Sequence, residues 1–334
     1  MYTAFYGLRE KPFSLTPDPR YLFLASSHRE ALAHVLYGLE QGEGFIAITG
    51  EVGTGKTTLC RTLLRRLRGD TEIAFVFNPT LTGKQLLGAI CNDFGLTSAG
   101  RTRAQLNDQL NQFLLETNRR GRRALLIVDE AQDLAPETLE ELRLLSNLET
   151  TTSKLIQILL FGQPELDEKL DSRELRQLRQ RISVRWHLGP MTARETSAYV
   201  LHRLGVAASE PRELFSGAAL REVQRQSRGI PRLVNLLCER ALLAGYADGT
   251  SRVEARQVAR AGVELLARRR PAWRRRLARH PGMVAAAALL CLAALGALAW
   301  QRASSPAAVA GAGPLPGVGA SASAAPGVAA GGGE

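Results

Sequence analysis

The stretch GEVGTGKTT, residues 50–58, decides the fold of this chain. Its first eight residues match GxxxxGK[ST], the pattern of a glycine-rich loop that holds phosphate groups. The apolar run FIAITG (45–50) precedes it, and the periodic segment TTLCRTLLRRL (57–67) follows it. Because a strand, this loop and a helix in that order are the context that the pattern needs, the sequence predicts a phosphate-binding loop at the edge of an α/β sheet.

The chemistry of this loop explains its residues. Glycines allow backbone N–H groups to curl around phosphate oxygens, and the helix N-terminus adds the positive end of its dipole. We expect Lys56 to reach the β- and γ-phosphates of ATP and the Thr57 hydroxyl to bind Mg²⁺. The residues predicted to bind the nucleotide in this loop are Gly50, Glu51, Val52, Gly53, Thr54, Gly55, Lys56, Thr57 and Thr58.

A second motif, LLIVDEAQ (125–132), completes the predicted site. Its apolar residues predict a buried strand, and Asp129 follows at the carboxyl end, where α/β sheets place their ligands. We expect Asp129 to hold Mg²⁺, through water, and Glu130 to polarise the attacking water as a general base. A plain turn at the end of a strand is the alternative interpretation, which the position some 70 residues after the loop disfavours.

Apolar runs and helical patterns alternate up to residue 190, and only helical patterns follow as far as residue 267. This order predicts a parallel sheet and then a small helical bundle. The four scattered cysteines argue against a zinc site or a disulfide framework. The expected divisions are an irregular N-terminal extension (1–27), the α/β core (28–190), the bundle (191–267), a basic segment (268–282), a transmembrane helix (283–300) and a disordered tail rich in Ala, Gly and Pro (301–334).

The net charge of +11 is unevenly distributed. Residues 1–267 carry 35 basic and 31 acidic side chains, whereas residues 268–334 carry eight arginines and one glutamate. Seven of these arginines precede the uncharged run 283–300, which would span about 27 Å as a helix. The asymmetry predicts a single membrane span with the N-terminal part in the cytoplasm and the tail in the periplasm. The alternative for the uncharged run is a soluble Ala-rich helix. The arginines would contact lipid headgroups at a membrane, and their alternative partner is nucleic acid.

Together these residues resemble the general secretion pathway protein A (ExeA) family of AAA+ ATPases. The resemblance rests on YGLREKPFSLTPDPRYLFLASSHREAL, the two motifs above, LRLLSNLET, KLIQILLFGQPEL, LRQLRQRISVRWHL and GIPRLVNLLCERALL, and covers nearly all of residues 1–267. It implies a five-stranded P-loop core with a helical lid, oligomers that complete each other's sites, and a cytoplasmic ATPase anchored in the bacterial inner membrane. It also implies a partner inner-membrane protein and a role in assembling the secretin of type II secretion.

Further site residues follow from the resemblance alone. Gln163 falls at the position of a polar sensor of the γ-phosphate, and Arg181 at that of the arginine finger offered to a neighbouring subunit, with Arg179 as the alternative. Arg232 matches a second sensor on the lid. The resemblance leaves open whether Tyr21 and Phe23 flank the adenine or only pack in the core.

The sequence departs from the longer family members after the predicted span, where 34 low-complexity residues remain. Peptidoglycan binding is therefore not expected of this chain, nor is direct binding of nucleic acid. Two other functions stay open at this point: a DNA-associated helper ATPase of the transposition type, and a nucleotide-binding regulator that hydrolyses slowly. The first predicts DNA-stimulated turnover, and the second predicts binding with little turnover.

Overall fold

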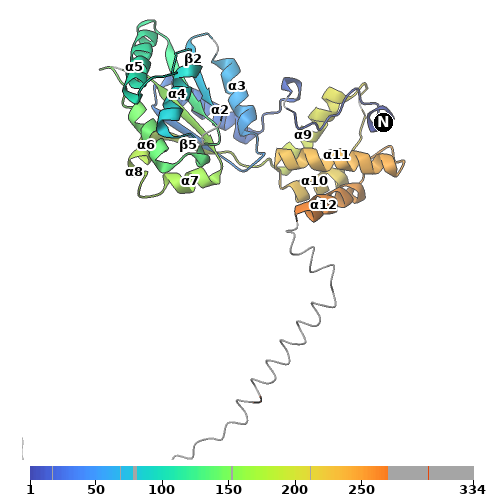
Figure 1. Ribbon diagram of the computed structural model, residues 1–334. Coiled ribbons are helices and arrows are strands. Elements are labelled where there is room, and N and C mark those ends of the chain that lie inside the picture. Colours follow the sequence, from blue (N-terminus) through green and yellow to red (C-terminus); the bar gives the residue numbers. More distant parts are fainter. Residues whose placement is uncertain are drawn as a thin grey trace, which may run out of the picture. The chain divides into compact units, whose positions relative to one another are not determined.

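A parallel β-sheet and a bundle of helices make up the folded part of the chain (Figure 1). The computed structural model describes residues 1–16, 18–67, 69–77, 81–151, 153–210, 212–269 and Trp300. Residues 1–269 form one unit, and residues 270–334 are a second unit of which only Trp300 is described. The basic segment beyond Arg269, the tail and all but the last residue of the predicted span therefore lie outside the described residues.

The sheet of the described chain has five strands in the order β2-β3-β4-β1-β5. Their pairings are all parallel, which confirms the predicted α/β core. The strands are β1 (Phe45–Thr49), β2 (Thr71–Val76), β3 (Arg123–Val128), β4 (Gln157–Gly162) and β5 (Ile182–His187).

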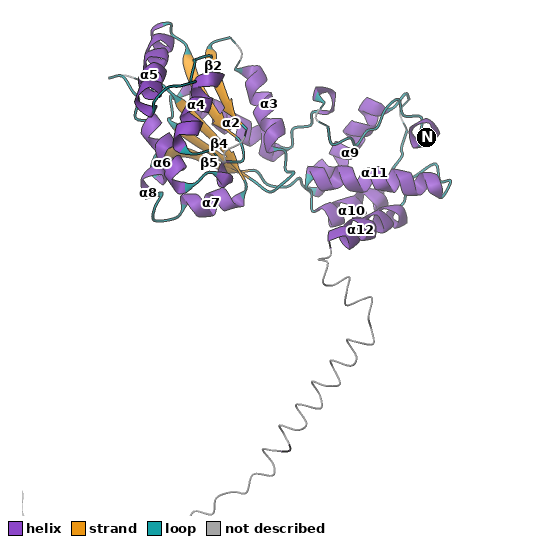
Figure 2. Ribbon diagram, in the orientation of Figure 1, coloured by secondary structure: helices purple, strands orange, loops and turns teal. Residues whose placement is uncertain are grey.

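Helices cover both faces of the sheet (Figure 2). Alternate residues of β1 show this: Phe45 and Ala47 lie in the apolar cluster under α4 and α5, whereas Ile46 and Ile48 lie in the cluster under α2 and α3. The helices around the sheet are α2 (Ser26–Glu40), α3 (Lys56–Arg66), α4 (Gly83–Asp93), α5 (Arg103–Arg119), η2 (Ala131–Asp133), α6 (Pro136–Leu145), α7 (Pro164–Leu170) and α8 (Arg176–Arg179).

The strand register brings three loops together at one edge of the sheet. Thr49 of β1 pairs with Gly162 of β4 and with His187 of β5, and Val128 of β3 pairs with Leu160. Because the strands are parallel, the residues that follow β1, β3 and β4 emerge at the same carboxyl edge.

The bundle consists of α9 (Ala193–Ala207), α10 (Gly217–Ser227), α11 (Pro231–Ala247) and α12 (Ala255–Arg269). Local sequence starts these helices. Thr192 and Glu195 form a capping box on α9, Ser216 caps α10 by accepting from the N–H of Ala219, and Pro231 opens α11.

The N-terminal segment is more ordered than the expected irregular extension. It holds α1 (Tyr2–Phe5) and the short helix η1 (Pro19–Tyr21), and its apolar side chains join the core of the helical bundle. The Tyr2 hydroxyl bonds the Glu239 carboxylate at 2.8 Å, and the Arg203 guanidinium donates to the carbonyl of Pro12 at 2.5 Å. Prolines exclude a long helix here, but they do not prevent tertiary packing.

Within the described residues, no helix is long and apolar enough to cross a membrane.

Candidate active site

The loop between β1 and α3 has the geometry that its glycines predict. Gly53 and Gly55 have φ angles of +86° and +105°, which L side chains rarely adopt. A Cβ on Gly53 would approach the Cβ of Arg232 to 2.5 Å, and a Cβ on Gly55 would approach Nε2 of His28 to 2.5 Å. The loop therefore has no room for side chains at these two positions.

Lys56 folds back over the loop. Its Nζ donates to the carbonyl of Gly50 at 2.6 Å and to that of Glu51 at 3.2 Å, and the side chain is 7% exposed. Burial lowers the pKa of Lys56, against the opposing effect of the Glu130 and Asp129 carboxylates. A buried ammonium beside two carbonyl oxygens is well placed to bind an anion that enters the loop.

Backbone donors line the same loop. Within the described part of the chain, the N–H groups of Gly53, Gly55, Lys56 and Thr57 have no hydrogen-bond acceptor. They stand at the N-terminus of α3, where the helix dipole favours negative charge. Donors without partners, around glycines that admit no side chain, fit phosphate oxygens.

Asp129 and Glu130 follow β3 at the carboxyl edge of the sheet. Asp129 is 8% exposed, and burial raises the pKa of its carboxyl group. The backbone of Glu130 is in the left-handed region, with φ of +52°, and its N–H donates to Oδ1 of Asp129 at 2.9 Å. A strained non-glycine residue directly after a buried carboxylate is typical of functional turns.

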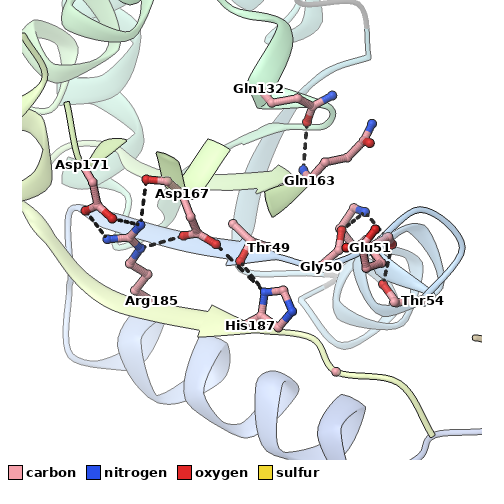
Figure 3. Close-up of polar contacts among 12 residues, drawn as sticks. Thr49, Gly50, Glu51, Thr54, Gln132, Gln163, Asp167, Asp171, Arg185 and His187 are labelled. Carbon is pink, nitrogen blue, oxygen red and sulfur yellow. Dashed lines mark hydrogen bonds and ion pairs between the residues drawn. The ribbon is translucent and has the colours of Figure 1, made fainter. Parts of the chain in front are cut away.

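Two glutamines connect Glu130 with the end of β4. Nε2 of Gln163 donates to Oε2 of Glu130 at 3.2 Å, and Nε2 of Gln132 donates to the same oxygen at 3.0 Å. The N–H of Gln163 also donates to Oε1 of Gln132 at 3.0 Å (Figure 3). Gln163 therefore lies beside Glu130, and Gln132, which the sequence motifs did not single out, bridges the two.

A pocket of about 680 Å³ lies over the loop. It includes Lys56, Thr57 and Glu130, and Arg232 reaches it from the start of α11. The N–H of Arg232 donates to the carbonyl of Gly53 at 3.2 Å. The volume is in the range of ligand-binding sites.

Tyr21 and Phe23 also line this pocket, but both have other contacts. The Tyr21 hydroxyl bonds Glu10 at 2.9 Å, and the Arg203 guanidinium lies 4.7 Å from the Tyr21 ring centre. Phe23 packs edge-on against Tyr199, with ring centres 5.7 Å apart. The two rings thus pack in the core of the bundle and border the pocket as well.

Arg181 and Arg179 lie away from this pocket. Arg181 immediately precedes β5, whose first residue, Ile182, pairs with Phe45 at the start of β1. Six residues of strand, about 20 Å at 3.3 Å per residue, separate it from the edge that carries the loop. Its Nη1 donates to the Ser146 hydroxyl at 3.3 Å. Neither arginine lines the pocket of its own chain, so a catalytic role for either requires a neighbouring subunit.

The structure adds a polar network that the motifs did not indicate. Arg185 on β5 donates to the carboxylates of Asp167 at 2.7 Å and Asp171 at 2.9 Å (Figure 3). Nδ1 of His187 lies 3.1 Å from the hydroxyl of Thr49, the last residue before the loop. These contacts tie α7, which follows Gln163, to β5, and β5 to β1, but no periodicity in the sequence signals them.

ATP and Mg²⁺ fit the residues present. Unpaired N–H groups and Lys56 suit the phosphates, and Mg²⁺ would be held by the Thr57 hydroxyl and the Asp129 carboxylate, which is a hard-oxygen set. The raised pKa of Asp129 also fits a cation site, because a nearby cation would stabilise the ionised form of this buried carboxylate. A bound Mg²⁺ would neutralise phosphate charge. In such a site Glu130 would be the group that accepts a proton from water.

Comparisons with known proteins concern the domain family and the fold. A family described as AAA domain matches residues 39–170. The chain is 46% identical to general secretion pathway protein A of Aeromonas hydrophila over 305 residues, which are 90% of this chain and 54% of that protein. The chain thus spans about half the length of the curated relative it matches.

Solved structures share the fold. The ORC2 protein of Aeropyrum pernix matches with a TM-score of 0.55 and 22% identity, over 76% of this chain and 71% of that one. The Drosophila ORC bound to DNA matches with a TM-score of 0.60 and 19% identity, over 79% of this chain and 66% of that one. At these identities the likeness concerns the AAA architecture alone.

The matched AAA domain and the 46% identity over most of the chain lead to one assignment. The chain is an AAA protein related to general secretion pathway protein A.

Proposed function

We propose that this protein is a membrane-anchored ATPase that hydrolyses ATP to ADP and phosphate and uses the energy to assemble an envelope complex, the secretin of type II secretion. The observation that supports hydrolysis most is the meeting of Lys56, Asp129, Glu130 and Gln163 at one edge of the sheet. The name of the Aeromonas relative supports the link with secretion.

Each residue has a distinct role in this proposal. Lys56 and the loop N–H groups hold the phosphates, while Thr57 and Asp129 hold Mg²⁺. Glu130 orients and deprotonates the attacking water, and Gln163, already bonded to Glu130, reports the γ-phosphate to it. Arg232 contacts the nucleotide from the bundle α9–α12, which serves as the lid of the site.

Arg181 acts in trans in this proposal. A guanidinium stabilises the charge that builds on the phosphoryl group, and its position at the far edge of the sheet suits the site of a second copy. Subunits would therefore assemble into a ring or another oligomer, with Arg179 as the alternative finger.

The membrane part of the proposal rests on sequence. The uncharged run 283–300, behind seven arginines, would cross the inner membrane once and leave the ATPase in the cytoplasm. The arginines would meet anionic lipid, and a partner inner-membrane secretion protein would couple the ATPase to the secretin.

The test compares the wild type with Lys56→Ala and with Lys84→Ala, an exposed lysine on α4. We expect phosphate release from ATP in the wild type and in Lys84→Ala, and none in Lys56→Ala. The full chain should sediment with inner membranes, and removal of residues 283–334 should release it. Turnover that persists in Lys56→Ala would refute the assignment of the site, and turnover that requires DNA would favour a DNA-associated ATPase.

A further inference from the structure

His28 is a buried polar residue that neither motif predicts. It lies in the first turn of α2, is 3% exposed and lines the nucleotide pocket. Its Nε2 is 2.9 Å from the carbonyl oxygen of Thr54, in the middle of the phosphate loop. Because a carbonyl only accepts, Nε2 carries the hydrogen, and because burial lowers the pKa of His28, the ring is neutral at pH 7.

This hydrogen bond orients one peptide unit of the loop. In a trans peptide, the carbonyl of Thr54 and the N–H of Gly55 point in opposite directions. With the carbonyl held by the imidazole, the Gly55 N–H must point away from His28. This N–H is one of the donors without an acceptor in the described chain, so His28 fixes the direction of a phosphate-binding group.

The lid holds the same turn of α2 from the other side. Helix α2 has no side-chain cap of its own, and the N–H of Ser26 donates to Oε1 of Glu195, from α9, at 2.6 Å. The other oxygen of Glu195 caps α9 itself, by accepting from the N–H of Thr192 at 2.9 Å. Burial acts to raise the pKa of Glu195, but the bonds from Ser26 and Thr192 outweigh it and lower the pKa to about 2.

The segment between β5 and α9, which connects the core to the lid, contacts this turn as well. The N–H of Gly189, two residues after β5, donates to the Ser27 hydroxyl at 3.1 Å. Ser26, Ser27 and His28 thus contact the lid, this connecting segment and the phosphate loop, respectively.

We propose that His28 is a positioning residue that couples the lid to the phosphate loop, through the chain of contacts Glu195–Ser26–His28–Thr54. When the lid sits on α2, Glu195 holds the first turn of that helix, and His28 keeps the Gly55 N–H turned toward the phosphates. When that contact is lost, the brace on the loop is weakened. The inference rests on the proposed nucleotide-binding function and adds a route by which the lid controls it.

The test measures the affinity for MgADP by calorimetry, because ADP undergoes no turnover during the titration. The variants are His28→Ala, Glu195→Ala and the double variant, with His28→Gln as the conservative replacement that keeps an N–H donor. Ser216→Ala is the matched control, because Ser216 caps its own helix, α10, by accepting from the N–H of Ala219. Thermal unfolding confirms that each variant is folded.

We expect the Kd for MgADP to rise about tenfold in His28→Ala and in Glu195→Ala, by loss of an oriented donor. The double variant should bind about as weakly as the weaker single variant, because both changes break one chain of contacts. His28→Gln should restore most of the affinity, and Ser216→Ala should retain it.

Additive losses in the double variant would overturn the coupling, and wild-type affinity in His28→Ala would overturn the role of His28. Both of these results require that the wild type binds MgADP. A wild type that does not bind would instead contradict the proposed function.

Discussion

Gly229 offers a test of how tightly the lid helix that carries Arg232 is placed. Gly229 has φ of +76°, and a Cβ there would lie 2.0 Å from the carbonyl oxygen of Met191. The N–H of Met191 donates to the carbonyl of Gly229 at 2.9 Å, so the two backbones are tied and cannot separate without losing this bond. Replacement by alanine therefore combines a strained backbone with a clash against fixed atoms.

The expected cost follows from these two contributions. An L residue in the left-handed region costs about 1–2 kcal/mol. Overpacking against backbone adds about 1–3 kcal/mol. Gly229→Ala should therefore lose about 2–5 kcal/mol of unfolding free energy. Gly249→Ala is the matched control, because Gly249 has φ of +68° and a Cβ there would meet no atom within 4 Å.

The assay is urea unfolding of the wild type and both variants, followed by circular dichroism. Gly249→Ala should lose only the conformational part, about 1–2 kcal/mol, while Gly229→Ala loses more and also binds MgADP more weakly, because the clash displaces the start of α11. Equal losses in the two variants would show that the Gly229–Met191 contact is looser than the structure has it.

Three further predictions concern the site. Asp129→Asn should raise the melting temperature of the nucleotide-free protein, because burial raises the carboxyl pKa above 3.8 and the ionised form destabilises the fold at pH 7; a lower melting temperature would contradict this. The same change should weaken Mg²⁺-dependent ATP binding. Burial holds the pKa of His28 below its ordinary value of 6.5, so the contribution of this residue to stability is fully present above pH 6.5 and is lost as pH falls from there through the lower folded-state pKa. His28→Gln should therefore flatten the fall in melting temperature between pH 7.5 and 5.5; an unchanged slope would speak against it. Arg181→Ala should lower ATPase activity by at least 10³-fold in the oligomer and leave ATP affinity unchanged, with Arg179→Ala as the comparison; a larger loss in Arg179→Ala would move the finger to that residue.

The strands and the phosphate site could be predicted because their signals are local. The GxxxxGK[ST] pattern needs a strand before it and a helix after it, and the apolar run before Asp129 marks a buried strand. The parallel register then places Gln163 beside Glu130, which chain order alone does not specify. Elements of this kind carry their own periodicity or glycine spacing.

The rest depends on contacts between distant parts of the chain. His28 looks like an ordinary helix residue until Thr54 is found 2.9 Å from it, and Glu195 looks like a simple capping residue until Ser26 is found at its other oxygen. Such roles are set by tertiary packing, and a single sequence contains no record of it. The same holds for the N-terminal segment. Its prolines predict an irregular extension, whereas its apolar side chains pack in the core of the bundle.

The most direct test of the central claim separates binding from hydrolysis at Glu130. In Glu130→Gln, MgATP should bind with an affinity close to that of the wild type, because the phosphates are held by Lys56 and the loop N–H groups. Single-turnover hydrolysis should fall by about 10²-fold or more, because the general base is lost. Hydrolysis at the wild-type rate in Glu130→Gln would contradict the account.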